Sequence, residues 1–208
     1  MARWLSISLA GLIAIVGAAP LQGAATGQAS EPSLPPPLQV IRDSNDAILA
    51  AFGDDDEITE EEKTRAFAAM DKVTDFGLMS DRAIDARCTD AGELCQVWKQ
   101  TFADLLRARA LSDAGRYRAD KFEYLSETID RGRATVYTLA FRDGEDYTLD
   151  YELTVQEGSW KIVNWIFDEV NTVDSYDRQF KRMLRKGRTV EELIDILQRR
   201  TEEFRSVQ

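Results

Sequence analysis

The protein contains no histidine among its 208 residues. Histidine is the commonest general base and metal ligand, so its absence excludes Ser–His and Cys–His nucleophile pairs and the usual zinc sites. Carboxylate chemistry stays open in principle, and Tyr151 with Asp168 is the candidate pair for proton transfer in an apolar pocket. We find no other catalytic constellation, and we expect a protein that is not an enzyme and needs neither a cofactor nor a metal.

Cysteine is nearly absent as well, with Cys88 and Cys95 the only two in the chain. A close pair in an oxidising compartment is usually bonded, and the C-x-x-C spacing of redox motifs is missing, so we expect a structural disulfide. On one continuous helix the two residues would be about 10 Å apart by rise alone, too far for a bond. The bond therefore requires a turn in segment 89–92, which Gly92 favours.

Long apolar runs are missing too, apart from one short run over about residues 4–16. It is too short to span a bilayer, which needs about 20 residues. A basic residue precedes it and small residues follow it, as in a secretory signal peptide. We expect a signal peptide over residues 1–25, a flexible leader over 26–37 and a single domain over 38–205, located in the periplasm.

Positive charge is scarce, with 26 Lys and Arg residues against 37 Asp and Glu residues and a formal net charge of -11. A chain this acidic is not attracted to phosphate backbones, which argues against nucleic acid as a partner. The same charge repels the chain as a whole from anionic lipid headgroups. It also keeps a periplasmic protein soluble, and we expect a monomer.

Helical periodicity predicts three helices in the first half of the chain and two at its end. We place the first three at about residues 38–52, 59–75 and 90–109. The second and the last begin with capping boxes, formed by Thr59 with Glu62 and by Thr189 with Glu192. Segment 75–77 is interpreted as the end of the second helix. The third helix has an apolar stripe that we interpret as core, made of Trp98, Phe102, Leu105 and Leu106.

Alternating patterning replaces helical patterning after the third helix. It predicts four strands, over residues 121–129, 134–142, 147–156 and 160–170. Turn residues at 131–132, 143–144 and 157–158 separate them, so the strands form an antiparallel meander. The order of helices, meander and helices predicts an α+β domain in which a curved, four-stranded antiparallel sheet packs with several helices.

The register of the second and third strands depends on the length of the turn between them. A two-residue turn at 143–144 would set Leu139 opposite Thr148, whereas a three-residue loop at 143–145 sets Leu139 opposite Leu149. We prefer the three-residue loop, because it keeps each face of the sheet uniform in polarity. Two-residue turns are expected at the other two positions.

This register gives the sheet one strongly apolar face. The candidate pocket residues on that face are Tyr137, Leu139, Tyr151, Leu153 and Ile162. The fourth strand also has Val163, Trp165 and Phe167 on its opposite face, so we expect a cover on both sides of it. Patterning does not distinguish a filled core from a cavity for an apolar ligand, and both interpretations stay open.

Four short motifs follow one another in the last third of the chain. They are WKIVN at 160–164, IFDEV at 166–170, YDRQF at 176–180 and VEELI at 190–194. Together they resemble the C-terminal region of the MlaC, or toluene-tolerance, family, and the resemblance extends loosely over nearly all of the chain after residue 25. Asn164 stands where the family usually has Asp, Glu169 replaces a loop Gly, and Asp177 replaces an Arg.

Members of that family are periplasmic phospholipid carriers, and the resemblance implies an MlaC-like form of the predicted fold with phospholipid as the ligand. It also implies two protein partners, an outer-membrane lipoprotein complex and an inner-membrane ABC transporter with a substrate-binding ring protein. Shuttling lipid between them would maintain outer-membrane lipid asymmetry. Two other classes stay open. An NTF2-like small-ligand-binding or enzyme domain predicts a buried polar group of shifted pKa, and a scaffold protein predicts a large exposed partner patch.

Overall fold

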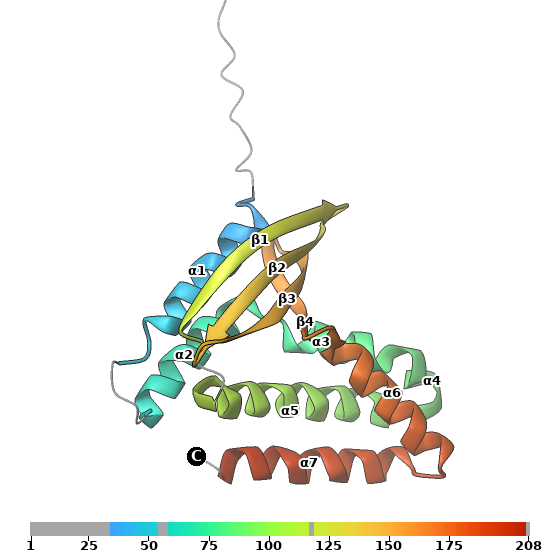
Figure 1. Cartoon of the computed structure of the whole chain (residues 1–208). Coiled ribbons are helices and arrows are strands. Elements are labelled where there is room, and N and C mark those ends of the chain that lie inside the picture. Colours follow the sequence, from blue (N-terminus) through green and yellow to red (C-terminus); the bar gives the residue numbers. More distant parts are fainter. Residues whose placement is uncertain (1–33, 54–57, 117–118, 207–208) are drawn as a thin grey trace, which may run out of the picture. The chain divides into compact units, whose positions relative to one another are not determined.

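A curved antiparallel sheet lies against a group of helices in the computed structural model of the chain (Figure 1). The structure describes residues 34–53, 58–116 and 119–206, which belong to one unit. The predicted signal peptide and the leader up to residue 33 lie outside the described residues. The predicted α+β class is confirmed by this arrangement.

The sheet has five strands in sequence order, β1-β2-β3-β4-β5. The strands are β1 (Lys121–Asp130), β2 (Arg133–Arg142), β3 (Glu145–Gln156), β4 (Ser159–Phe167) and β5 (Val170–Asn171). The first four are the predicted strands, with bounds that differ by one to three residues. The two-residue β5 folds back on the end of β4 through a tight turn at 168–169.

The turn between β2 and β3 differs from the prediction. Segment 143–144 is a two-residue turn with φ of 52° and 83°, the positive values that a type I′ turn requires and that match the twist of the strands. Leu139 therefore pairs with Thr148 and not with Leu149. The three-residue loop was wrong, and a register change of one residue moves the side chains of a strand to the opposite face.

The inner face of β2, which is the face toward the helices, consequently consists of short residues. They are Ala134, Val136, Thr138 and Ala140, all buried. Tyr137 and Leu139 point away from the helices, and the Tyr137 side chain is exposed. The predicted two-residue turns at 131–132 and 157–158 are both present.

Two β-bulges adjust which side chains reach the inner face. Leu125 is an extra residue in β1 and Val163 an extra residue in β4, at the two register shifts of the sheet. After Val163 the residues of β4 that face the helices are the odd-numbered ones, because the extra residue shifts the alternation by one. Trp165 therefore pairs with Tyr151 and lies, like Tyr151, on the inner face of the sheet. The prediction that Trp165 and Phe167 lie on the opposite face was therefore wrong.

The helices are α1 (Pro37–Leu49), α2 (Glu60–Val73), α3 (Phe76–Ile84), the 3₁₀ turn η1 (Asp85–Arg87), α4 (Cys88–Ala91), α5 (Leu94–Arg116), α6 (Thr172–Arg185) and α7 (Val190–Ser206). Two of them, α3 and the four-residue α4, were not predicted from the sequence. Asp75 does not end α2 but caps α3, accepting a hydrogen bond from the Leu78 N–H at 2.9 Å. Both predicted capping boxes are formed, at the start of α2 and of α7.

Two main hydrophobic clusters hold the unit together, and a third, small one, made of Ala51, Phe52 and Ala66, joins the end of α1 to α2. The larger one joins α3, α5, α6 and α7 around Trp98, Phe102 and Phe180, so the predicted stripe of α5 is core. The smaller one joins α1 to the sheet around Ile41 and Leu153. Trp165 of β4 packs against both clusters, so the two clusters meet at β4.

Candidate functional site

A cavity of about 810 Å³ lies between the inner face of the sheet and helices α1, α2, α5 and α6. Ligand pockets in proteins have volumes of about 300–1,000 Å³, so this cavity lies in the upper part of that range. Most of its wall is aliphatic or aromatic. The apolar lining includes Ile48, Leu49 and Phe52 of α1, Met70 of α2, Leu106 of α5 and Leu149 of β3.

The inner end of the cavity is closed by the small core cluster. Along β3, Tyr147, Leu149 and Tyr151 line the cavity, whereas Leu153 lies beyond it and packs with Ile41. Hydrophobic side chains therefore fill the space between α1 and the sheet at this end and leave it open farther along β3.

A polar pair interrupts the apolar wall at this inner end. The Tyr151 hydroxyl donates a hydrogen bond of 3.1 Å to Oδ1 of Asn45, and both side chains are buried. Within the described part of the chain, Nδ2 of Asn45 has no hydrogen-bond partner. The nearby Tyr124 hydroxyl, which also has no hydrogen-bond partner among the described residues, acts on the same Asn45 side chain.

The other end of the cavity is open to solvent and is more polar. Phe167 and Val170, at the β4–β5 turn, line the cavity and are exposed, and the Phe167 ring stacks on Tyr147 with 4.8 Å between centroids. Arg109 of α5 lines the same end and donates a hydrogen bond of 3.3 Å to the Tyr176 hydroxyl. We call this end the mouth.

Helix α6 contributes a polar strip to the mouth. Thr172, Ser175 and Gln179 line the cavity and, at spacings of three and four residues, lie on one side of α6. This side is next to the one that carries the buried Val173 and Phe180. A ligand with an apolar body and a polar head would fit this arrangement, with the body inside and the head at the mouth.

The candidate proton-transfer pair is not assembled. Burial raises the pKa of Tyr151 and keeps its hydroxyl neutral, and that hydroxyl donates to Asn45. Asp168 lies at the mouth, where its Oδ1 accepts a hydrogen bond of 3.0 Å from the Thr148 N–H. The two groups line one cavity but have different partners.

Two of the five predicted pocket residues, Tyr151 and Ile162, line the cavity. Leu153 is buried in the small core cluster next to the cavity's inner end. Tyr137 and Leu139 lie on the outer face of the sheet, because the turn before β3 is one residue shorter than predicted. Whether any of the five binds a ligand stays a prediction.

Several lining residues were not among the predicted ones. Trp165 and Phe167 were missed because strand alternation does not reveal the bulge at Val163. The α6 strip at 172, 175 and 179 follows helical spacing and could have been found as a polar strip beside the buried one.

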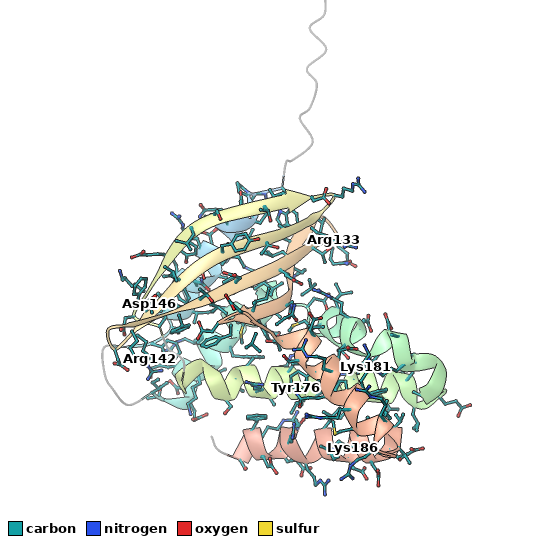
Figure 2. All side chains as sticks on the ribbon, turned by 45° about the vertical axis from the view of Figure 1, so that its right-hand side comes forward. Arg133, Arg142, Asp146, Tyr176, Lys181 and Lys186 are labelled. Atoms are coloured by element: carbon teal, nitrogen blue, oxygen red, sulfur yellow. A yellow bond between two sulfur atoms is a disulfide. The ribbon has the colours of Figure 1, made fainter. Side chains whose placement is uncertain are left out.

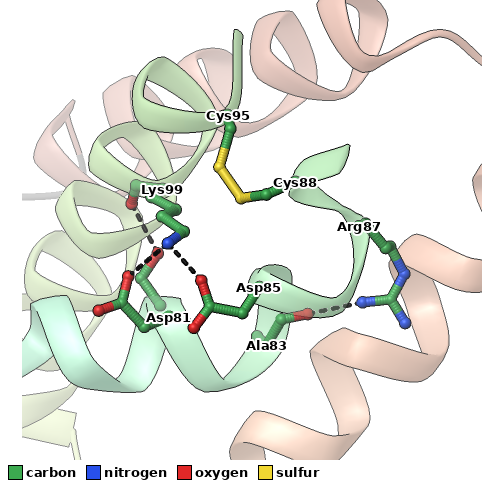
Figure 3. The surroundings of a disulfide bond; sticks show 8 residues. Asp81, Ala83, Asp85, Arg87, Cys88, Cys95 and Lys99 are labelled. Atoms are coloured by element: carbon green, nitrogen blue, oxygen red, sulfur yellow. Dashed lines mark hydrogen bonds and ion pairs between the residues drawn. A yellow bond between two sulfur atoms is a disulfide. The ribbon is translucent and has the colours of Figure 1, made fainter. Parts of the chain in front are cut away.

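A disulfide joins Cys88 in α4 to Cys95 in α5, with 5.0 Å between the Cα atoms (Figure 3). Gly92, at a φ of 55°, separates the two helices and provides the turn that such a bond requires. Neither cysteine lines the cavity. The bond therefore fixes the beginning of α5 at a distance from the candidate site.

Charged side chains surround the disulfide (Figure 3). Lys99 of α5 forms ion pairs with Asp81, at 3.0 Å, and with Asp85. Arg87 donates a hydrogen bond of 2.7 Å to the Ala83 carbonyl and pairs with Asp177 of α6. These contacts connect α3, α5 and α6 around the larger core.

Residues 34–53, 58–116 and 119–206 contain no group of three His, Cys, Asp or Glu side chains that is placed to hold a metal ion. The helices of the same ranges include none with the length and apolar character of a membrane span.

The chain matches one protein family over most of its length. The sequence profile of the family described as MlaC protein matches residues 42–199. No curated protein matches the chain. A solved structure, that of a phospholipid-binding protein from Ralstonia solanacearum in complex with a phospholipid, is similar with a TM-score of 0.68 and 18% sequence identity. The match covers 80% of this chain and 97% of that chain, and at this identity it shows a shared fold.

Proposed function

The chain belongs to the MlaC family, and on that premise we propose that it is a phospholipid carrier that encloses acyl chains in its cavity. The main support is the cavity itself, which is large, mostly apolar and open at one end. A filled core would have favoured a scaffold protein.

The cavity volume suits acyl chains. A methylene group is close in volume to a water molecule, whose share of the liquid is about 30 Å³. A cavity of about 810 Å³ thus holds on the order of 25 methylene groups, which is more than one common fatty acyl chain. Each methylene kept out of water is worth about 0.8 kcal/mol, so the cavity offsets much of the cost of taking acyl chains out of a membrane.

The mouth suits the headgroup. Arg109 and the α6 strip at 172, 175 and 179 place polar groups where the acyl chains would end. The headgroup can stay in contact with water there, and its phosphate needs no buried counter-charge. This orientation leaves Tyr151 and Asn45 beside the acyl portion of the lipid.

The carrier would work in the periplasm as a monomer without enzymatic activity. It would receive and deliver phospholipid between an outer-membrane lipoprotein complex and the ring protein of an inner-membrane ABC transporter, and so maintain outer-membrane lipid asymmetry. A diacyl lipid does not cross an aqueous compartment unaided, because its chains must remain shielded from water.

The first test is native mass spectrometry of the protein purified from its own periplasm, with extraction and identification of any bound lipid. We expect a mass increment equal to one phospholipid. A protein that is free of ligand, and that stays so after mixing with phospholipid vesicles, would contradict the carrier function.

A pair of variants tests the cavity as the binding site. Leu149→Trp adds bulk to the cavity wall, whereas Leu139→Trp adds the same bulk on the outer face of the neighbouring strand. We expect the Leu149→Trp variant to retain at least ten times less lipid than the Leu139→Trp variant. The added indole displaces a bound ligand only if it projects into the space that the ligand occupies. Equal retention by both folded variants would place the lipid elsewhere.

A small-ligand-binding protein is the second candidate, and the Asn45–Tyr151 pair is the observation that favours it. The pair places a buried hydroxyl and an amide on the cavity wall, and a few such polar groups in a mostly apolar pocket orient a small polar ligand. The same mass spectrum distinguishes the two candidates, because a small ligand gives an increment far below that of a phospholipid.

A further inference from the structure

A stripe of basic side chains follows α6 and the turn after it on the solvent side of the unit (Figure 2). The α6 basic stripe consists of Arg178, Lys181, Arg182, Arg185, Lys186 and Arg188, all exposed. Six of the 26 Lys and Arg residues of the chain thus lie within residues 178–188, a segment that contains none of its 37 Asp and Glu residues. In a chain with a net charge of -11, this is a concentrated region of the opposite sign.

Much of this charge is not neutralised inside the protein. Lys181 pairs with Asp177 at 3.0 Å, and Arg188 lies 3.7 Å from Glu192. Arg182, Arg185 and Lys186 form no ion pair with any described residue. The helix dipole favours cations in the last turn, which accounts for Arg182 and Arg185 but not for the earlier members of the stripe.

The stripe borders the cavity mouth. Residues three and seven positions apart lie on neighbouring parts of a helix surface, so Arg178 and Arg182 flank Ser175, which lines the mouth. Phe167 and Val170 are exposed at the same mouth, and Val170 is 56% exposed. The stripe therefore begins beside the mouth, at Arg178 and Arg182, and continues along α6 away from it to Lys186 and Arg188.

We propose that the α6 basic stripe docks the cavity mouth onto an anionic phospholipid surface. This inference rests on the proposed carrier function. Basic side chains attract anionic headgroups, and exposed apolar side chains beside them enter the headgroup region, a combination typical of proteins that lie on a membrane. An acidic protein partner would match the charge too, but a lipid surface also offers the cargo that the adjoining apolar cavity is proposed to hold.

The net charge of the rest of the chain makes this docking directional. Predominantly acidic surfaces are repelled by an anionic membrane, whereas the stripe is attracted to it. The molecule would therefore approach with the mouth first. The repulsion from anionic headgroups that the net charge predicts applies to the molecule as a whole, and the α6 basic stripe is the exception to it.

The test is co-sedimentation with vesicles of phosphatidylcholine alone and with vesicles of equal parts phosphatidylcholine and phosphatidylglycerol. We expect binding to the anionic vesicles that weakens as salt is added, and little binding to the neutral ones. Arg178→Gln/Arg182→Gln/Arg185→Gln removes three stripe charges. It should weaken binding about a hundredfold, the equivalent of about 1 kcal/mol for each charge.

The matched control is Arg199→Gln/Arg200→Gln/Arg205→Gln, which makes the same change in net charge on exposed positions of α7 that do not line the cavity. It should bind the anionic vesicles nearly as well as the parent. Equal loss in both triple variants, or equal binding to neutral and anionic vesicles, would overturn the proposal. Absence of binding to either vesicle would overturn it too, and would favour an acidic protein as the partner of the stripe.

Native mass spectrometry of the same samples separates this proposal from the carrier function. A protein that contains phospholipid but does not bind the vesicles contradicts only the docking surface. A protein that binds the vesicles but never contains lipid contradicts the carrier function.

Discussion

Asp177 and Arg87 form the most buried ion pair among the described residues, between α6 and the 3₁₀ turn η1. Burial acts to raise the pKa of Asp177, but hydrogen bonds from Lys181 and Arg87 outweigh it, and the pKa of this carboxyl lies below its usual range. A depressed pKa in the folded state means that the pair stabilises the protein above the unfolded value, which is about 3.9. This stability is lost as the pH falls through the lower folded value.

We therefore expect Asp177→Asn to destabilise the protein by about 2–3 kcal/mol at neutral pH, because it leaves the buried Arg87 guanidinium without a counter-charge. The difference from the parent should vanish in acid, where Asp177 of the parent is protonated as well. Urea unfolding over a series of pH values measures both effects. Asp195→Asn, on an exposed position of α7, is the control and should change little.

Glu169 is strained in a way that one substitution can relieve. In the β4–β5 turn it has a φ of 65°, a value that side-chain-bearing residues adopt at a cost of about 1–2 kcal/mol. Glu169→Gly should raise the free energy of unfolding by about 0.5–1 kcal/mol, since glycine also loses more chain entropy on folding. Thermal unfolding measures the gain. Glu123→Gly, in the middle of β1, should destabilise, and a loss in both would show that the turn is not strained.

Among the elements, the disulfide has an effect on stability that is separate from ligand binding. Replacing both Cys88 and Cys95 by Ser should cost about 2–3 kcal/mol, as expected for a loop with a sequence separation of 7. Lipid retention should be unchanged, because neither residue lines the cavity. Chemical denaturation with and without reductant measures the first effect, and mass spectrometry the second. Loss of lipid in the double variant would mean that the position of α5 depends on the bond.

The strands also show how far the sequence determines the fold. The four long strands, their order and two of the three turns between them follow from alternation and turn residues, whereas the two-residue β5 was not predicted. The β2–β3 register did not follow from them, because β2 has its large apolar residues, Tyr137, Leu139 and Phe141, on the outer face and short ones inside. We chose the turn length from the expectation that each face of the sheet is uniform in polarity, and this was wrong for β2. The preference of an Asp-Gly pair for a two-residue type I′ turn predicts the observed length.

Helix α3 was missed for a local reason. Asp75 at its beginning was interpreted as the end of the preceding helix, although Asp is a favoured N-cap residue. The helix is short, with nine residues, and periodicity over two turns is a weak signal.

At the scale of the whole molecule, the cavity was beyond prediction. The same apolar residues, Ile48, Leu106 and Leu149 among them, would face inward in a filled core and in a hollow one. What differs is the distance between the two core clusters, and this depends on how α1 and α5 are placed, which local patterns do not encode.

A bound lipid should stabilise the whole unit. Protein from which lipid has been extracted should unfold at a lower temperature, and added phospholipid at a hundred times its dissociation constant should restore about 2.7 kcal/mol. Differential scanning calorimetry measures the shift. The Leu149→Trp variant should show a much smaller one, and an equal shift in parent and variant would mean that the lipid acts outside the cavity.

The strand order has a consequence for how quickly the chain folds. Every long strand of the sheet pairs with the strand that precedes or follows it along the chain, and short turns join them. Contacts of low sequence separation need little loop closure, so the meander can form one hairpin at a time. The sheet can therefore assemble in the order in which its strands follow one another along the chain, and α6, which lines the cavity opposite the sheet, is added afterwards.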